Sequence, residues 1–191
     1  MTTTVVIPEH FLVTHEQFEQ LALANRDLKL ERTRDGELII MPPTGEETER
    51  KNAEISGQLY VWNKQAQLGL AFNSSAAFIL PNGAERSPDA SWVKKFRWSA
   101  LTVEQQQSVI PLCPDFVIEL KSKGDSLKDL QDKMNEYIDN GAQLGWLIVP
   151  DTKTIYIYQK DGAVEVFQNL VKVSVDTLLP GFELDLTDIF D

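Results

Sequence analysis

The sequence predicts an α/β fold in which helices flank a mixed central sheet. Two antiparallel hairpins are expected, with turns at 34–36 and 160–162, because Asp-Gly favours tight turns between strands. Between them, an apolar strand at 115–121, an amphipathic helix at 127–140 and an apolar strand at 144–149 follow with short connections. Such a strand–helix–strand unit forms a right-handed crossover, so its two strands are predicted to be parallel.

The remaining elements follow from apolar periodicity and from helix caps. The segment Thr14-His15-Glu16-Gln17 has the form of a capping box, and apolar residues at helical spacing come after it. In chain order we then expect strands at 28–33 and 37–41, a helix from a cap at 44–47 to about 67, short strands at 70–73 and 77–80, a strand from Asp89, an insertion at 96–113 with a helix at 102–107, strands at 155–158 and 164–167, and an acidic tail.

The composition is typical of a soluble globular protein. With 191 residues, 42% hydrophobic and 25% charged, we expect one domain over 1–191, made of an N-terminal arm and helix (1–25), a core (26–150) and a C-terminal hairpin and tail (151–191). No apolar run approaches the roughly 20 residues of a membrane span, and no secretory leader is evident. The single Cys113 cannot form an internal disulfide. These features predict a cytoplasmic protein.

The net charge of −11 disfavours tight, non-specific binding to DNA, because such binding rests on Lys and Arg. The charge is uneven, however. The segment 85–133 holds eight basic and eight acidic residues, so the whole acidic excess lies outside it. This distribution is compatible with a metal-dependent enzyme that meets nucleic acid transiently or as an oligomer.

Candidate catalytic residues lie at the ends of two apolar strands. In the segment 114–122, Glu119 and Lys121 are two residues apart and therefore share one face of a strand. Asp89 follows Pro88 at the start of an earlier strand. Carboxylates suit hard cations such as Mg²⁺ or Mn²⁺, and the carbonyl of Leu120 is a candidate third oxygen. The alternative is that Glu119 and Lys121 form a surface ion pair, which would stabilise the protein by less than ~1 kcal/mol.

These segments together resemble the PD-(D/E)xK nuclease superfamily, and more specifically a large bacterial family of restriction-endonuclease-like proteins. The resemblance covers roughly residues 10–190. It rests on the order and spacing of Met41-Pro42-Pro43, the segments 86–93 and 114–122, Lys133 with Tyr137 and Gly141, and the segments 145–150 and 179–182.

The resemblance implies a restriction-endonuclease-like fold and a magnesium-dependent phosphodiesterase. By the match, Asp89 and Glu119 take the metal-ligand roles and Lys121 takes the lysine role. The lysine after the glutamate is not dependable in this family, and Lys133 on the following helix is the candidate substitute. The alternative for Lys133 is a solvated side chain that lies along apolar neighbours.

The superfamily often adds an acid from its first core helix. Glu47 and Glu54 lie on the corresponding helix, and we expect both to have surface roles; Asn52 is a weaker candidate for a polar position facing the site. The two histidines, His10 and His15, are not spaced as in any familiar zinc motif, and no central histidine is present to activate a nucleophile.

The predicted function is therefore a nuclease that hydrolyses phosphodiester bonds, in DNA, with Mg²⁺ or Mn²⁺ as cofactor and as a homodimer. The sequence leaves two alternatives open. One is a non-catalytic nucleic-acid-binding or assembly protein that retains the fold, and the other is a hydrolase of small phosphate esters.

Overall fold

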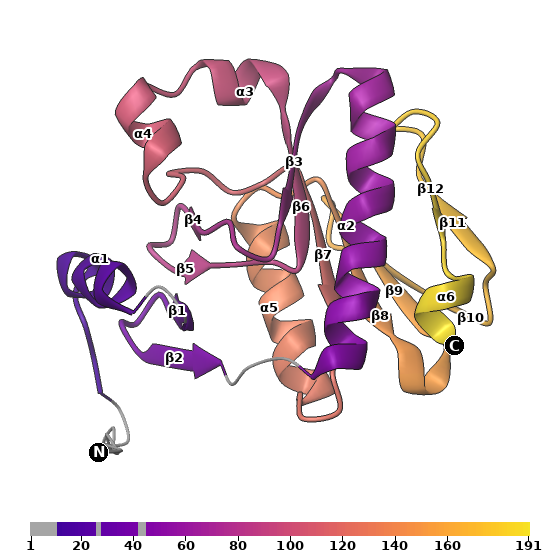
Figure 1. Cartoon of the computed structure of the whole chain (residues 1–191), viewed down its shortest axis with the longest axis horizontal. Helices are drawn as coiled ribbons and strands as arrows, with labels where there is room; N and C mark the ends of the chain where they lie inside the picture. Colours follow the sequence, from indigo (N-terminus) through magenta and orange to yellow (C-terminus); the bar gives the residue numbers. More distant parts are fainter. Residues whose placement is uncertain (1–10, 26–27, 42–44) are drawn as a thin grey trace.

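A six-stranded mixed sheet forms the centre of the computed structural model, which describes residues 11–25, 28–41 and 45–191 (Figure 1). Its strands lie in the order β10 (Val164–Gln168), β9 (Thr154–Gln159), β8 (Leu144–Val149), β7 (Phe116–Leu120), β6 (Ala90–Lys94) and β3 (Gly69–Asn73). β7 and β8 are parallel, and every other neighbouring pair is antiparallel. Helix α5 (Leu127–Asp139) joins the parallel pair. The predicted mixed α/β class and its parallel crossover are confirmed.

A smaller sheet of four strands lies beside the large one, in the order β2 (Leu38–Met41), β1 (Lys29–Arg32), β5 (Glu85–Arg86) and β4 (Phe78–Ile79). β1 and β2 form the hairpin that the sequence predicts, and Gly36 takes a positive φ of 94° in its turn. The two-residue strand β5, which pairs with β1 at Arg32 and Glu85, was not predicted. It brings the first hairpin next to the segment that leads into β6.

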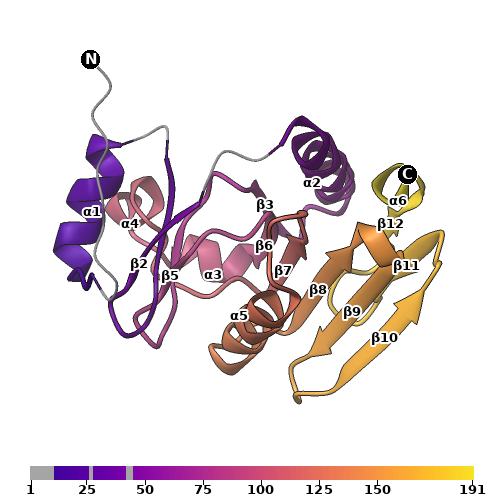
Figure 2. The same ribbon diagram turned by 90° about the horizontal axis from the view of Figure 1, so that it is seen from below.

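Two helices cover opposite faces of the large sheet (Figure 2). On one face, α2 (Glu46–Ala66) packs Ile55 and Leu59 into a core cluster with Ile118 of β7. On the other face, α5 packs Met134 and Tyr137 into a second cluster with Val117. Because successive strand residues alternate in direction, Glu119 lies on the α5 side together with Val117. The apolar pattern of β7 thus directs a carboxylate toward α5.

Helix caps explain several of the helix boundaries. The predicted capping box begins α1 (His15–Ala24): the Thr14 backbone N–H donates to Gln17 at 2.9 Å, and the Thr14 hydroxyl accepts from the Gln17 backbone at 3.2 Å. Thr102 caps α4 (Val103–Gln107) in the same way. The predicted cap residue Thr44 lies outside the described residues, as do the arm at 1–10, with His10, and Pro42-Pro43; Gly45 is the N-cap of α2.

The C-terminal segment differs from the acidic tail that the sequence predicts. It forms β11 (Lys172–Ser174), β12 (Glu183–Asp185) and the short helix α6 (Thr187–Phe190). Its acids alternate with Leu184, Leu186 and Ile189, which are fully buried in the same cluster as α2. Apolar burial, which outweighs the local acidity, therefore folds the segment onto the core. The structure also contains α3 (Lys95–Ser99) and a 3-10 turn, η1 (Pro150–Thr152), which were not predicted.

Cys113 is buried beside α5, where its thiol donates to the carbonyl of Tyr137 at 3.5 Å. Burial raises the pKa of the Cys113 thiol to about 12, so the group stays protonated and unreactive at neutral pH. Within the described residues, none of the helices combines the length and the hydropathy that a membrane span requires.

The packing of edge strand β3 provides a test of the fold. A Cβ atom at Gly69 would lie 2.2 Å from the carbonyl oxygen of Val93, which is backbone and cannot move aside easily. We expect Gly69→Ala to destabilise the protein by about 1–3 kcal/mol. Gly57→Ala, at an exposed position within α2 with no atom within 4 Å of the new Cβ, should stabilise it by about 0.5–1 kcal/mol. Urea unfolding of both variants measures the difference, and equal stabilities would contradict the described packing.

Candidate active site

The five predicted site residues line one cavity of about 610 Å³ at the end of β7. They are Asp89, Glu119, Leu120, Lys121 and Lys133. The cavity walls come from β1, the N-terminal turn of α2, the turn between β7 and α5, and α5 itself. The two acids, which are separated by 30 positions in sequence, thus reach a common space from neighbouring strands that pair at Ala90 and Ile118.

Asp89 is held by contacts to both of its carboxylate oxygens. Oδ2 accepts a hydrogen bond from the backbone N–H of Leu120 at 2.9 Å, and Oδ1 accepts one from the ammonium of Lys29 at 3.1 Å. The first contact ties the side chain to the strand that carries Glu119. The second places a positive charge from β1 directly on the carboxylate.

Glu119 is 3% exposed and lies between strand β7 and helix α5. Its Oε1 accepts from the Lys133 ammonium at 2.8 Å and from the Tyr137 hydroxyl at 3.0 Å. Burial raises the pKa of Glu119 to about 7, because desolvation and the negative charge of Asp89 outweigh the opposing effect of Lys133. The positive charge of Lys133 therefore does not fully compensate the ionised carboxylate of Glu119 at neutral pH.

Lys133 bridges two buried carboxylates and is only 12% exposed. Its Nζ lies 2.8 Å from Oε1 of Glu119 and 2.8 Å from Oε1 of Glu31. Burial lowers the pKa of Lys133, but the two carboxylates raise it further, and the net shift is upward from the ordinary value. The side chain is thus an ammonium directed into the site, and it does not extend to solvent.

Lys121 also lines the cavity, but its ammonium is engaged differently. Its Nζ donates to the backbone carbonyl of Ser122 at 2.9 Å, and among the described residues it has no ion pair with Asp89 or Glu119. Of the two candidate lysines, Lys133 is therefore the one in direct contact with a site carboxylate.

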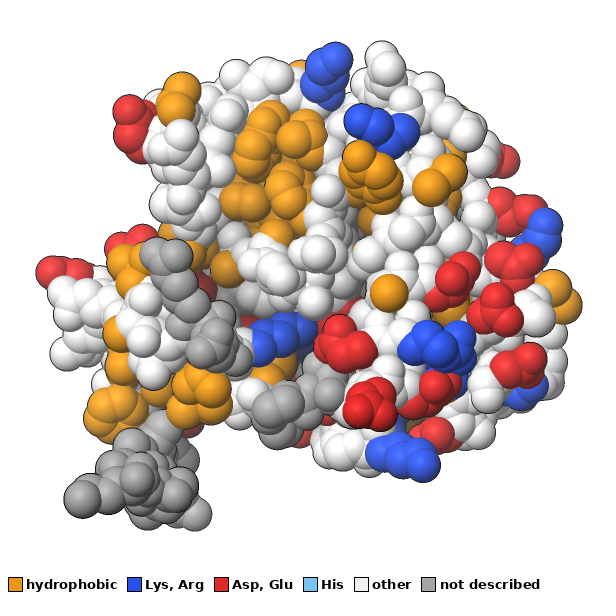
Figure 3. Space-filling model, in the orientation of Figure 1, with side chains coloured by type: hydrophobic (Ala, Val, Ile, Leu, Met, Phe, Trp, Pro, Cys, Tyr) orange, Lys and Arg blue, Asp and Glu red, His pale blue; other side chains and the backbone are white. Residues whose placement is uncertain are grey.

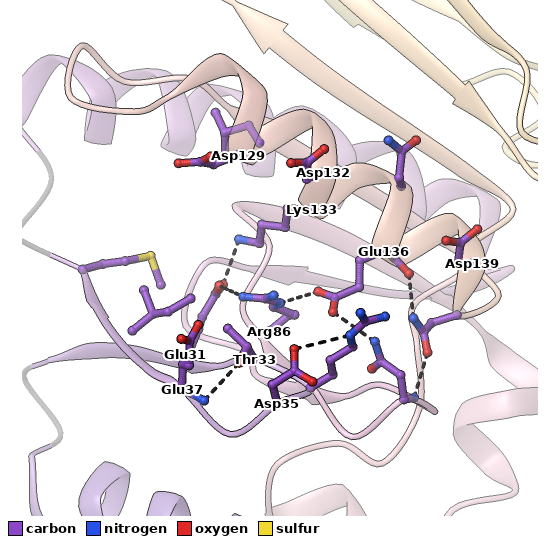
Figure 4. A pocket seen from close by; sticks show the side chains of 17 residues that line it. Glu31, Thr33, Asp35, Glu37, Arg86, Asp129, Asp132, Lys133, Glu136 and Asp139 are labelled. Carbon is purple, nitrogen blue, oxygen red and sulfur yellow. Dashed lines mark hydrogen bonds and ion pairs between the residues drawn. The ribbon is translucent and has the colours of Figure 1, made fainter. Parts of the chain in front are cut away.

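Glu31 of β1 belongs to the same network (Figure 4). It was not identified as a site residue from the sequence. Its Oε1 accepts from the backbone N–H of Ser87 at 2.9 Å and its Oε2 from Arg86 at 3.1 Å, in addition to the contact with Lys133. Burial raises the pKa of Glu31, but Lys133 and Arg86 outweigh it and the net shift is downward. Arg86 in turn donates to Glu136 of α5 at 2.6 Å.

One sequence signal points to Glu31. Lys29 and Glu31 alternate along β1 and so share a strand face, in the same way as Glu119 and Lys121 do at the end of β7. The pattern was informative at β7 because apolar residues surround it. In β1, the sequence Lys-Leu-Glu-Arg is typical of an exposed strand, although Glu31 is buried.

The polar residues of α2 lie near the site without reaching its carboxylates in any described contact. Glu47 lines the cavity rim and pairs with Arg50 at 2.8 Å. Glu54 accepts from Gln58 at 2.9 Å. Asn52 is buried, and its Oδ1 has no hydrogen-bond partner among the described residues. Nδ1 of His15, on α1, lies 2.8 Å from Oε1 of Glu85.

The donors present fit a hard divalent cation by their chemistry. Within residues 11–25, 28–41 and 45–191, no set of three or more Asp, Glu, His and Cys side chains is grouped to hold a metal. Mg²⁺, however, commonly binds through only one or two carboxylates and keeps several waters. The raised pKa of Glu119 indicates a carboxylate that a nearby cation would stabilise. Asp89, Glu119 and the Leu120 carbonyl are the oxygens that would hold it.

Comparisons with known proteins give a consistent result. The family model Uma2, described as "Putative restriction endonuclease", matches residues 15–187. A crystal structure described as a putative nuclease belonging to DUF820, from Anabaena variabilis, matches with a TM-score of 0.77 and 23% identity, covering 93% of this chain and 97% of that one. At this identity the likeness establishes a shared fold. No curated protein is detectably similar to the chain.

Proposed function

The chain belongs to the Uma2 family, and from this premise we propose that it is a metal-dependent nuclease that hydrolyses phosphodiester bonds in DNA. The observation that carries the proposal is the convergence of Asp89 and Glu119 on one cavity, with the ammonium of Lys133 on Glu119. Paired carboxylates beside a fixed positive charge are suited to phosphoryl-transfer chemistry, in which positioning and electrostatics supply most of the catalysis.

Each residue then has a distinct role. Asp89, Glu119 and the carbonyl of Leu120 would hold Mg²⁺ or Mn²⁺, which would supply Lewis-acid polarisation of a phosphate oxygen and activation of water. Tyr137 and Lys133 donate to Glu119 and fix the orientation of its carboxylate. We assign the lysine role to Lys133, because Lys121 is bonded to Ser122. Homodimer formation stays a prediction, with the edge strands of the late hairpin and the insertion at 96–113 as the expected contact surfaces.

The full-length protein and supercoiled plasmid test this function. Nicking or linearisation is expected with Mg²⁺ or Mn²⁺ and should stop when EDTA removes the metal. The same protein incubated with a chromogenic phosphodiester separates a nuclease from a hydrolase of small esters, because the latter would turn over only the small substrate. Metal binding by calorimetry without cleavage of either substrate would favour the non-catalytic alternative.

Magnesium affinity is expected to increase between pH 6 and pH 8. Burial raises the pKa of Glu119 to about 7, so below that pH a proton neutralises the carboxylate and competes with the cation. For a group with this pKa the ionised fraction increases about tenfold over the interval, and the association constant should follow it. Calorimetry in buffers of different ionisation enthalpy measures both the affinity and the protons released. An affinity that does not change with pH would exclude Glu119 as a ligand.

A further inference from the structure

Lysine side chains also line the cavity that holds Asp89 and Glu119. Lys51 comes from α2, and Lys121 and Lys123 come from the turn between β7 and α5. Among the described residues, none of these three lysines forms an ion pair with either site carboxylate. The cavity lining therefore includes lysines whose charge is not neutralised by Asp89 or Glu119, together with further acids such as Glu47 and Asp125.

Lys51 is the most informative of the three because it is 9% exposed. Its one described ion pair is with Oε1 of Glu47 at a long 3.5 Å. That carboxylate is exposed and is already bound by Arg50 through contacts of 2.8 and 3.2 Å. The Lys51 side chain is thus largely buried, while its one described ion pair is long and is shared with Arg50, which leaves its positive charge available to a ligand in the cavity.

The turn that carries the other two lysines is held by its own hydrogen bonds. Oδ2 of Asp125 accepts from both the backbone N–H and the hydroxyl of Ser122, each at 2.7 Å. Lys121 is bonded only to a neutral carbonyl, and Lys123 is exposed with no partner among the residues described. The turn is thus ordered while the positive charges on it are not neutralised.

We propose that Lys51, with Lys121 and Lys123, forms a subsite for a backbone phosphate of a polynucleotide beside the Asp89–Glu119 pair. The inference rests on the proposed function and adds how the substrate is held. The chain carries a net charge of −11, and on the face seen in Figure 3 acidic side chains, with basic ones among them, lie around the lower end of α2. On this proposal, the three lysines of the cavity supply the attraction for the phosphate.

Binding of a phosphate by these three lysines has a measurable consequence. Each phosphate neutralised on a single strand contributes about −0.7 to the slope of log affinity against log salt concentration. Loss of Lys51 should therefore make the slope shallower by about 0.7. It should also weaken binding by about tenfold at low salt, the range expected for one charge-assisted contact.

The experiment uses the full chain and fluorescein-labelled 12-mer DNA and RNA in EDTA, with anisotropy read from 20 to 200 mM NaCl. Lys51→Met is compared with Lys64→Met, which removes the same charge from an exposed position on the same helix. Lys51→Arg should restore most of the binding, and Lys123→Met provides a second arm if Lys51→Met does not fold. Equal effects on DNA and RNA are expected, because the subsite contacts only phosphate.

The outcomes separate this inference from the proposed function. If Lys51→Met and Lys123→Met both bind like Lys64→Met, with the same salt slope, the subsite is wrong, even if the wild type cleaves plasmid with magnesium. If Lys51→Met loses binding while the wild type cleaves nothing, the subsite stands and the nuclease proposal fails.

Discussion

Replacing Lys133 with methionine is expected to lower the free energy of unfolding by about 3–5 kcal/mol, the cost of leaving buried charges without their partner. The Lys133 ammonium contacts two buried carboxylates, those of Glu31 and Glu119. Glu31 keeps Arg86 after the substitution, whereas Glu119 keeps, among the described residues, only the hydroxyl of Tyr137. Most of the loss should therefore arise at Glu119. Urea unfolding at pH 8 measures it.

The deficit should depend on pH in a defined direction. Removal of Lys133 raises the pKa of Glu119 further, so the variant is least stable at high pH, where the unpaired carboxylate is ionised, and recovers as pH falls and a proton neutralises it. Lys133→Met combined with Glu119→Gln should regain part of the stability. Lys128→Met, which breaks an exposed pair with Asp132 on the same helix, should change stability by less than about 0.5 kcal/mol. A Lys133→Met protein as stable as this control would contradict the buried bridge.

Glu119→Gln is expected to abolish magnesium binding and to reduce plasmid cleavage by about a hundredfold or more, because loss of the cation removes several kcal/mol of transition-state stabilisation. The amide carbonyl of glutamine can still accept from Lys133 and Tyr137, so the packing around the site is retained. What the variant loses is the negative charge. Calorimetric titration with MgCl₂ and plasmid cleavage measure the two effects separately.

The matched control for this substitution is Asp132→Asn, which removes one negative charge from an exposed position of α5. It should bind magnesium and cleave plasmid as the wild type does. Circular dichroism and thermal melting verify that Glu119→Gln remains folded. Unchanged magnesium affinity in a folded Glu119→Gln protein would rule out the carboxylate pair as the metal site.

The convergence of Asp89 and Glu119 was predicted from local rules together with the family resemblance, since the residue pattern alone left surface roles open for both acids. Asp89 lies just before one apolar strand and Glu119 near the end of a neighbouring strand of the same sheet, where strand alternation fixes the face that Glu119 occupies. The parallel crossover through α5 placed Lys133 near the inward face for the same reason. These features depend on the period of a strand or helix, which the chain displays directly.

Lys29 and Glu31 could not be assigned in this way, because their contacts depend on how two sheets pack together. Glu31 is buried where β5, a two-residue strand with no propensity signal, ties the first hairpin to the segment before β6 and where Lys133 of α5 contacts it. The same limit applies at the C-terminus, where the acids suggested an acidic tail. Leu184 and Leu186 alternate with those acids, but the alternation is too short to show that this face packs against α2.

The bridge between Glu31 and Lys133 joins residues 102 positions apart. During synthesis the glutamate emerges first and stays hydrated until the helix with its lysine has formed and the hairpin has docked, an ordering in which distant contacts come last. A nascent or half-assembled chain therefore lacks the complete set of charges around Glu119, and the site is complete only in molecules that have finished folding.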